Sequence, residues 1–124
     1  MSHLIPLAFL LAVLGAPAFP GTDGVRVAFR EDGPPGIYGV ACDASFRAVP
    51  GNAQELCEGM PDRSAVIYLD EIGDDRLFLL KTLRHETCHH ELGINWKAKT
   101  TYGRFQEAAC YRIAAEYREG LEAR

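Results

Sequence analysis

Two histidines separated by three residues constrain this chain more than any other feature of its sequence. Residues 85–89 read HETCH, so His85 and His89 lie four positions apart and Glu86 follows the first of them. On an α-helix, side chains at i and i+4 share a face and their Cβ atoms lie about 6 Å apart, so both imidazoles can bind one metal ion. Glu86 is rotated by about 100° from His85 around such a helix, which places its carboxylate beside the ion.

The residues on either side of HETCH predict that this segment is helical. Leucines recur at helical spacing at Leu77, Leu80 and Leu83. Asp74 or Asp75 can accept hydrogen bonds from the free N–H groups at the helix start, and Gly93 is suited to end the helix. A second helix is predicted from Thr101 to about Glu119, ending at Gly120.

A third metal ligand has to come from outside the HETCH segment. A catalytic zinc ion takes three protein ligands and keeps one position open for water. His90 is the one other histidine after residue 18, and it falls on a different face of the helix. Glu107 follows His89 by 18 residues, enough to turn and return on the second helix, so we predict it as the third ligand. Glu116 is the less favourable choice, and a merely solvated Glu107 on an amphipathic helix stays open.

Four cysteines predict two disulfides if the chain is exported. Of the three possible connectivities we favour Cys42–Cys57 and Cys88–Cys110. Cys88 and Cys110 each stand three residues after a predicted metal ligand, so helices that share one ion would bring both sulfurs together. Each bridge would contribute about 3 kcal/mol in the chain-entropy model. The alternative is four reduced, buried thiols in a cytosolic protein.

The N-terminal segment has the composition of a signal peptide. Residues 4–16 read LIPLAFLLAVLGA, without a charge, and small residues follow at Ala16 and Ala18. The run of about 13 residues is shorter than the roughly 20 that span a bilayer. The segment before the run lacks Lys and Arg, and a buried helix or membrane anchor is the alternative. We predict a signal peptide at 1–18, cleaved after Ala18, a single domain at 19–124, and a secreted or periplasmic protein.

Charge excludes one class of partner. The chain has 13 basic and 17 acidic residues, a net charge of −4, and all of them follow residue 18. Because affinity for nucleic acid comes largely from clustered Lys and Arg, we expect no nucleic-acid partner. We also expect no stable membrane insertion once the signal is removed. An acidic cluster invites a calcium site, but it lacks the ligand spacing of a calcium loop and suits a helix start: Asp70, Glu71, Asp74 and Asp75.

Strands are predicted before the helices. Residues 25–30 alternate in a strand-like way, 37–42 read as a second strand, and the stretch between them has turn chemistry. Residues 43–63 are predicted to be a long loop. Residues 65–69, AVIYL, form the clearest strand of the chain. Strands followed by two long helices predict an α+β fold.

HETCHHELG followed by QEAACYRIAAEY resembles the HExxH-plus-Glu zinc metallopeptidases, the gluzincins, and is nearest the small ImmA/IrrE-like members. The resemblance covers residues 64–117. It implies a small zincin-like domain in which one Zn²⁺ per chain is bound by His85, His89 and Glu107, with Glu86 as general base. It implies a peptide or protein substrate lying extended along residues 64–70 as the edge strand.

Two features depart from that family. Thermolysin-type members have an Asp four residues after the third ligand, where this chain has Tyr111; another carboxylate such as Asp70 would have to replace it. Intracellular ImmA/IrrE-like proteins cut repressors, so an exported version needs another substrate. For the oxyanion donor we consider His90, Tyr102 and Tyr111, and prefer Tyr102 as catalytic.

Three functions are therefore considered. The first is a secreted zinc metalloendopeptidase in which Glu86 activates water. The second is a catalytically weak or inactive zinc-binding protein of the same fold. The third is a disulfide-stabilised exported binding protein without metal.

Overall fold

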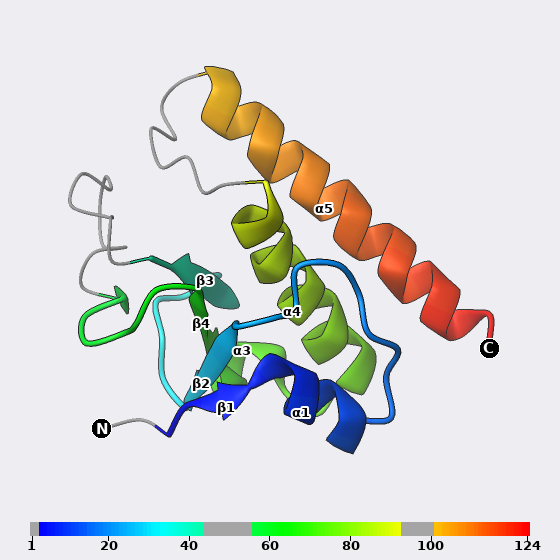
Figure 1. Cartoon of the computed structure of the whole chain (residues 1–124), viewed down its shortest axis with the longest axis horizontal. Helices are drawn as coiled ribbons and strands as arrows, with labels where there is room; N and C mark the ends of the chain where they lie inside the picture. Colours follow the sequence, from blue (N-terminus) through cyan, green and yellow to red (C-terminus); the bar gives the residue numbers. More distant parts are fainter. Residues whose placement is uncertain (1–2, 44–55, 93–100) are drawn as a thin grey trace.

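The computed structural model describes residues 3–43, 56–92 and 101–124, with side chains from Phe105 onward in the last range. Figure 1 shows a small sheet next to two long helices. The α+β class predicted from the sequence is confirmed. In chain order, the elements are β1 (Ile5–Pro6), α1 (Leu7–Val13), β2 (Arg26–Arg30), β3 (Gly39–Cys42), β4 (Ser64–Tyr68), α3 (Leu69–Ile72), α4 (Arg76–Glu91) and α5 (Thr101–Glu122).

The sheet is mixed and its strand order is β1-β2-β4-β3. β2 and β4 run parallel, while β1 and β3 pair antiparallel with β2 and β4 respectively. The prediction that residues 64–70 form the edge strand is wrong, because β4 lies between β2 and β3. All five residues of β4 are buried, as expected of a strand covered on both faces. The edge beside β4 is β3, which pairs with β4 alone in the described part of the chain.

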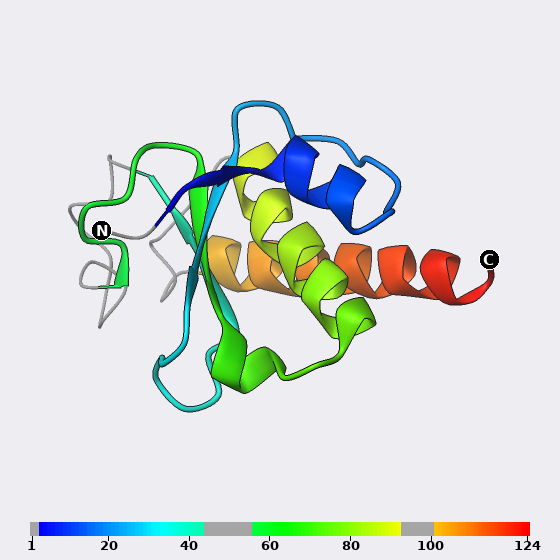
Figure 2. The ribbon, with the colours of Figure 1, turned by 90° about the horizontal axis from the view of Figure 1, so that it is seen from below.

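Helices cover one face of the sheet. Figure 2 shows α1, α4 and α5 on the same side, with residues 56–63 on the other. The core between sheet and helices includes Val27, Ile67, Leu80 and Leu83, each at most 1% exposed. A smaller cluster on the opposite face contains Val40, Cys42, Val66 and Tyr68. α4 therefore packs on the sheet through residues that include Leu80 and Leu83.

The predicted start of α4 is confirmed and the predicted end of α5 is wrong by three residues. Asp75 is the N-cap of α4 and its carboxylate accepts a hydrogen bond from the Phe78 N–H at 3.0 Å. α5 continues through Gly120, because a glycine costs a helix only about 1 kcal/mol and the Arg118–Glu122 pair supports the last turn at 2.8 Å. Gly93 lies outside the described residues.

Both favoured disulfides are confirmed. Cys42–Cys57 ties β3 to the segment before β4, with Cα atoms 5.6 Å apart. Cys88–Cys110 joins α4 to α5, with Cα atoms 5.5 Å apart. Both sulfurs of the second bridge belong to fully buried residues. The two helices are therefore cross-linked through their shared interface.

The segment predicted to be a signal peptide packs against the rest of the full-length chain. Leu7, Leu10 and Leu11 of α1 are buried in the main core. The Leu7 N–H donates to the Val25 carbonyl at 2.9 Å, and the Tyr117 hydroxyl donates to the Pro17 carbonyl at 3.0 Å. Within the described residues no helix combines the length and hydropathy needed to cross a membrane. Cleavage after Ala18 stays a prediction, and it would remove three leucines from this core.

Two substitutions on α1 test whether the segment is part of the folded core. Leu11 is 2% exposed and Val13 is 65% exposed. We expect Leu11→Ala to lower the free energy of unfolding of the full-length chain by about 3 kcal/mol and Val13→Ala by less than about 0.5 kcal/mol. Urea denaturation followed by circular dichroism measures both. Equal, negligible effects would show that α1 is not part of the core.

Candidate metal centre

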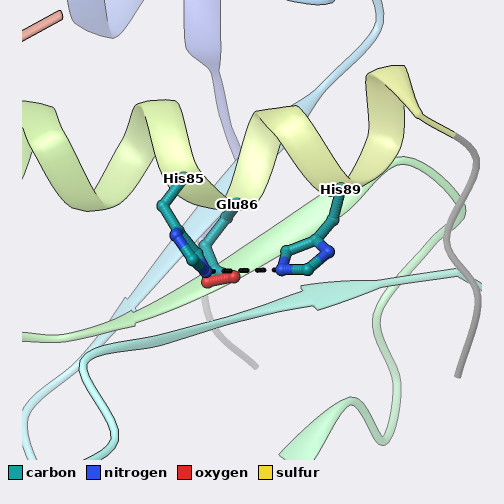
Figure 3. A group of neighbouring side chains, drawn as sticks. All are labelled: His85, Glu86 and His89. Carbon is teal, nitrogen blue, oxygen red and sulfur yellow. Dashed lines mark hydrogen bonds between the residues drawn. The ribbon is translucent and has the colours of Figure 1, made fainter. Parts of the chain in front are cut away.

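His85 and His89 project from α4 toward one point. Their Nε2 atoms lie 3.3 Å apart and their ring centroids 5.0 Å apart. Figure 3 shows both rings on the same side of the helix, one turn from each other. Two imidazole nitrogens bound to one tetrahedral zinc at about 2.0–2.1 Å would be separated by about 3.3 Å. The spacing found here is therefore that of two ligands of a single ion.

Glu107 of α5 faces both histidines. Its Oε1 lies 2.9 Å from His85 Nε2 and its Oε2 lies 2.9 Å from His89 Nε2. Cys110, one turn further along α5, is bonded to Cys88 of α4, and this bridge fixes the position of α5. The carboxylate predicted as third ligand is thus in place. Glu116 is exposed on a later turn of α5.

Glu86 completes the cluster. One ligand atom from each of His85, Glu86 and His89 lies within 4.8 Å of the others, so this group could hold a metal ion. Figure 3 shows the Glu86 side chain reaching the same point as the two imidazoles. The residue is 5% exposed, and burial raises the pKa of its carboxyl group. A carboxylate with a raised pKa is suited to accept and return protons.

Gln106 orients the second histidine. Its Oε1 lies 2.8 Å from His89 Nδ1, and since this oxygen only accepts, Nδ1 carries the proton. When the ring is neutral, this leaves the lone pair of Nε2 facing the cluster. The sequence pattern alone does not indicate a function for Gln106, and the available signal is its place next to Glu107. Asp70, considered for such a function, is instead exposed in α3, where its carboxyl group interacts with Asp32.

Three candidates for the oxyanion donor have different positions. The His90 ring is directed away from the cluster, with Nε2 2.8 Å from the Ser64 carbonyl oxygen. Tyr111, which stands where thermolysin-type proteins have Asp, packs on His85 with ring centroids 4.4 Å apart. Tyr102 lies in the first turn of α5, and its side chain is outside the described part of the structure. Of these three candidates, Tyr111 is therefore the one whose described side chain packs on a residue of the cluster.

The cluster is electrostatically coupled. Burial opposes the charge of His89, but the hydrogen bonds that its ring donates to Glu107 and Gln106, together with the charge of Glu86, outweigh burial and raise the His89 pKa. Burial also opposes the charge of Glu107, but its contacts with His85 and His89 are stronger and hold the Glu107 pKa well below its usual value. Without metal, the carboxylate and a protonated imidazole form an ion pair.

The donor set fits a borderline-soft divalent ion. Two imidazoles and a carboxylate are ligands that zinc takes in catalytic sites. One detail differs between the histidines: His89 Nδ1 has Gln106 as partner, whereas His85 Nδ1 is buried and has no hydrogen-bond partner among the described residues. In most metal sites that second nitrogen is hydrogen-bonded as well. Gln106 therefore supports one ligand more firmly than the other.

Zinc binding tests this cluster directly. We expect the full-length protein to bind about one zinc ion per chain, and His85→Ala or Glu107→Ala to weaken binding by more than about 100-fold. Gln106→Ala removes an orienting group and should cost about tenfold. Glu116→Gln, on the same helix as Glu107, is the matched control and should have no effect. Competition with a zinc chelator measures the affinities; unchanged binding in His85→Ala would exclude this centre.

In the metal-free protein, the ion pair should stabilise the fold most between about pH 4.5 and 6.5. Because folding lowers the Glu107 pKa from 4.5, its carboxylate contributes stability that is fully present above about pH 4.5. That stability is lost as the pH falls through the lowered pKa. Because folding raises the His89 pKa from 6.5, its imidazolium contributes stability that is fully present below about pH 6.5. That stability is lost as the pH rises through the raised pKa. Glu107→Gln should therefore destabilise the chelator-treated protein more at about pH 5.5 than at about pH 8.5. Urea midpoints at both pH values check this, and a pH-independent effect would contradict it.

Comparison with models of protein families, with curated proteins and with solved structures gives no significant match to this chain. The resemblance to gluzincins therefore rests on residues 85–93 and 106–117 of the sequence. The geometry adds an observation that the sequence lacked, because it brings Glu86, Glu107 and both histidines to one place. Function is accordingly inferred from this site.

Proposed function

We propose that this protein is a secreted zinc-dependent metalloendopeptidase with a zincin-like domain. The observation that carries the proposal is the meeting of His85 and His89 of α4 with Glu107 of α5, 2.9 Å from each Nε2 atom. Glu86, buried beside them, supplies a second carboxylate, which we assign as general base and not as a ligand. The ligands are two neutral imidazoles and one carboxylate, which leaves zinc a net charge of about +1.

Bound zinc would polarise a peptide carbonyl and acidify a water molecule. Glu86 would accept the proton of that water and transfer it to the leaving amine. Its burial supports this function, since a raised pKa brings a carboxyl group closer to neutral pH. Glu107 keeps its charge because its pKa is lowered, so it is suited to bind the ion rather than to carry protons.

The substrate backbone would pair with β3. β3 is the sheet edge on the side of the metal centre, and Gly39 at its start lines the same cavity as His85 and Glu86. A Cβ on Gly39 would lie 2.9 Å from Ile67 Cδ1 and 3.2 Å from Thr82 Cγ2, so the glycine lets β3 approach α4 closely. An extended peptide can add to such an edge through main-chain hydrogen bonds.

Two tyrosines are candidates for stabilising the developing oxyanion. The sequence favours Tyr102, whereas Tyr111 is the one whose side chain the structure describes at the site. The Tyr111 phenol lines the cavity beside His85 and Glu86. Burial, followed by the charges of Glu107 and Glu86, raises its pKa, so the hydroxyl stays a hydrogen-bond donor at neutral pH. Export is supported by the two disulfides, which persist in oxidising compartments.

A metal-free binding protein is the second candidate. Glu107 accepts from both imidazoles, so the central polar groups are paired without an ion. Such a network can also serve as a structural contact between α4 and α5. Zinc content of the purified protein separates this candidate from the first.

Glu86→Gln separates an active peptidase from an inactive zinc-binding protein. The amide cannot accept the proton, so we expect hydrolysis to fall at least about 100-fold while zinc binding changes little. Glu116→Gln is the control and should cleave at the parent rate. Mass spectrometry of unstructured peptides incubated with zinc-loaded protein measures cleavage. Cleavage that persists in Glu86→Gln would contradict the assigned mechanism.

A further inference from the structure

The metal centre opens into one cavity of about 360 Å³. The cavity lies between the start of β3, α4 and α5, and His85, Glu86 and Glu107 line it. Its volume is at the lower end of the range of about 300–1,000 Å³ that holds small ligands. It therefore suits one or two residues of a peptide rather than a larger group.

Most of the remaining wall is apolar. Tyr38 and Phe78 meet edge to face with ring centroids 4.8 Å apart, and Ile37, Tyr111 and Ala114 extend the wall. Tyr38 and Tyr111 are 41% and 59% exposed, so their rings offer surface that a ligand can cover. An apolar or aromatic side chain would gain from burial against these rings.

Among the described residues that line this cavity, Lys81 is the one cation. It stands four residues before His85 on α4, so the two side chains share a helix face one turn apart. Lys81 is half-buried, and no carboxylate of the described residues forms an ion pair with it. Other basic side chains of α4 are engaged: Arg84 pairs with Glu91 at 3.2 Å, and Arg76 donates to the Leu14 carbonyl. An ammonium group beside an apolar cavity is a recognition element for a carboxylate.

We infer that the cavity binds a peptide residue with an apolar side chain, and that Lys81 pairs with a carboxylate one or two residues beyond the scissile bond. The inference rests on the proposed function and names its substrate class. The four residues from Lys81 to His85 rise about 6 Å along α4, which corresponds to about two residues of an extended peptide. The carboxylate is either the α-carboxylate of a substrate cut near its C-terminus or an Asp or Glu side chain within a longer chain.

Binding to a variant that does not hydrolyse tests this separately from catalysis. Zinc-loaded Glu86→Gln protein is titrated calorimetrically with three peptides of matched sequence containing one Phe: one with a free C-terminus, one amidated, and one amidated with Glu after Phe. We expect the first or the third to bind about tenfold more tightly than the amidated peptide without Glu. Which of the two binds more tightly identifies the source of the carboxylate.

Variants at position 81 test whether Lys81 causes the tighter binding of the carboxylate-bearing peptides. Adding Lys81→Met should abolish the tenfold difference while leaving binding of the neutral peptide unchanged. Lys81→Arg should retain it. Arg112→Met on the exposed side of α5 removes the same charge and is the matched control, which should retain the full preference.

A preference that survives Lys81→Met, or equal binding of all three peptides, or no peptide binding at all, overturns the inference. A preference that depends on Lys81 without hydrolysis by the zinc-loaded parent protein supports the recognition site and contradicts the peptidase. In an active enzyme, Lys81→Met should raise KM for the carboxylate-bearing substrate about tenfold and leave kcat nearly unchanged, because the pairing is present before and during the reaction.

Discussion

The contact between α4 and α5 is the constraint on which the site depends. α4 alone supplies two imidazoles and Glu86, but Glu107 reaches them only because α5 packs alongside. Cys88 follows His85 by three residues and Cys110 follows Glu107 by three, so their bridge fixes the relative positions of the two donors. A closed loop of this length contributes about 3 kcal/mol. Its larger consequence is geometric, because sliding of one helix along the other would separate the carboxylate from the imidazoles.

Local and short-range signals were enough to predict that contact. Helical periodicity, the Asp75 cap and the i, i+4 histidines each depend on neighbours within a few positions. Matched cysteine spacing then linked two helices that are distant in sequence. By contrast, the place of β4 inside the sheet depends on which strands flank it, and sequence pattern leaves that open. The continuous apolar run AVIYL at residues 65–69 could have indicated an interior strand. The contact of Gln106 with His89 could not be predicted, because it depends on the orientation of the His89 ring.

The N-terminal segment shows why composition alone leaves two interpretations open. An uncharged apolar run of seven to fifteen residues suits a signal peptide, and it suits a helix of the core equally well. In the full-length chain the segment makes specific contacts, because the Leu7 N–H donates to the Val25 carbonyl and Arg76 donates to the Leu14 carbonyl, while cleavage after Ala18 stays a prediction. Leu7, Leu10 and Leu11 face the core, whereas Phe9 and Val13 are exposed. This sidedness comes from packing and was not visible as a clear pattern in the sequence.

The cavity opens to one side of the candidate metal centre. His85, Glu86 and Glu107 line it, whereas His89 does not, so the open side of the centre faces the first histidine. His89 is held from behind by Gln106, and His85 is covered by the Tyr111 ring. Tyr111 and Lys81 line the same cavity. Because the paired Glu107 and imidazoles already lie at ligand spacing, loading with zinc would replace protons and would require little movement of the helices.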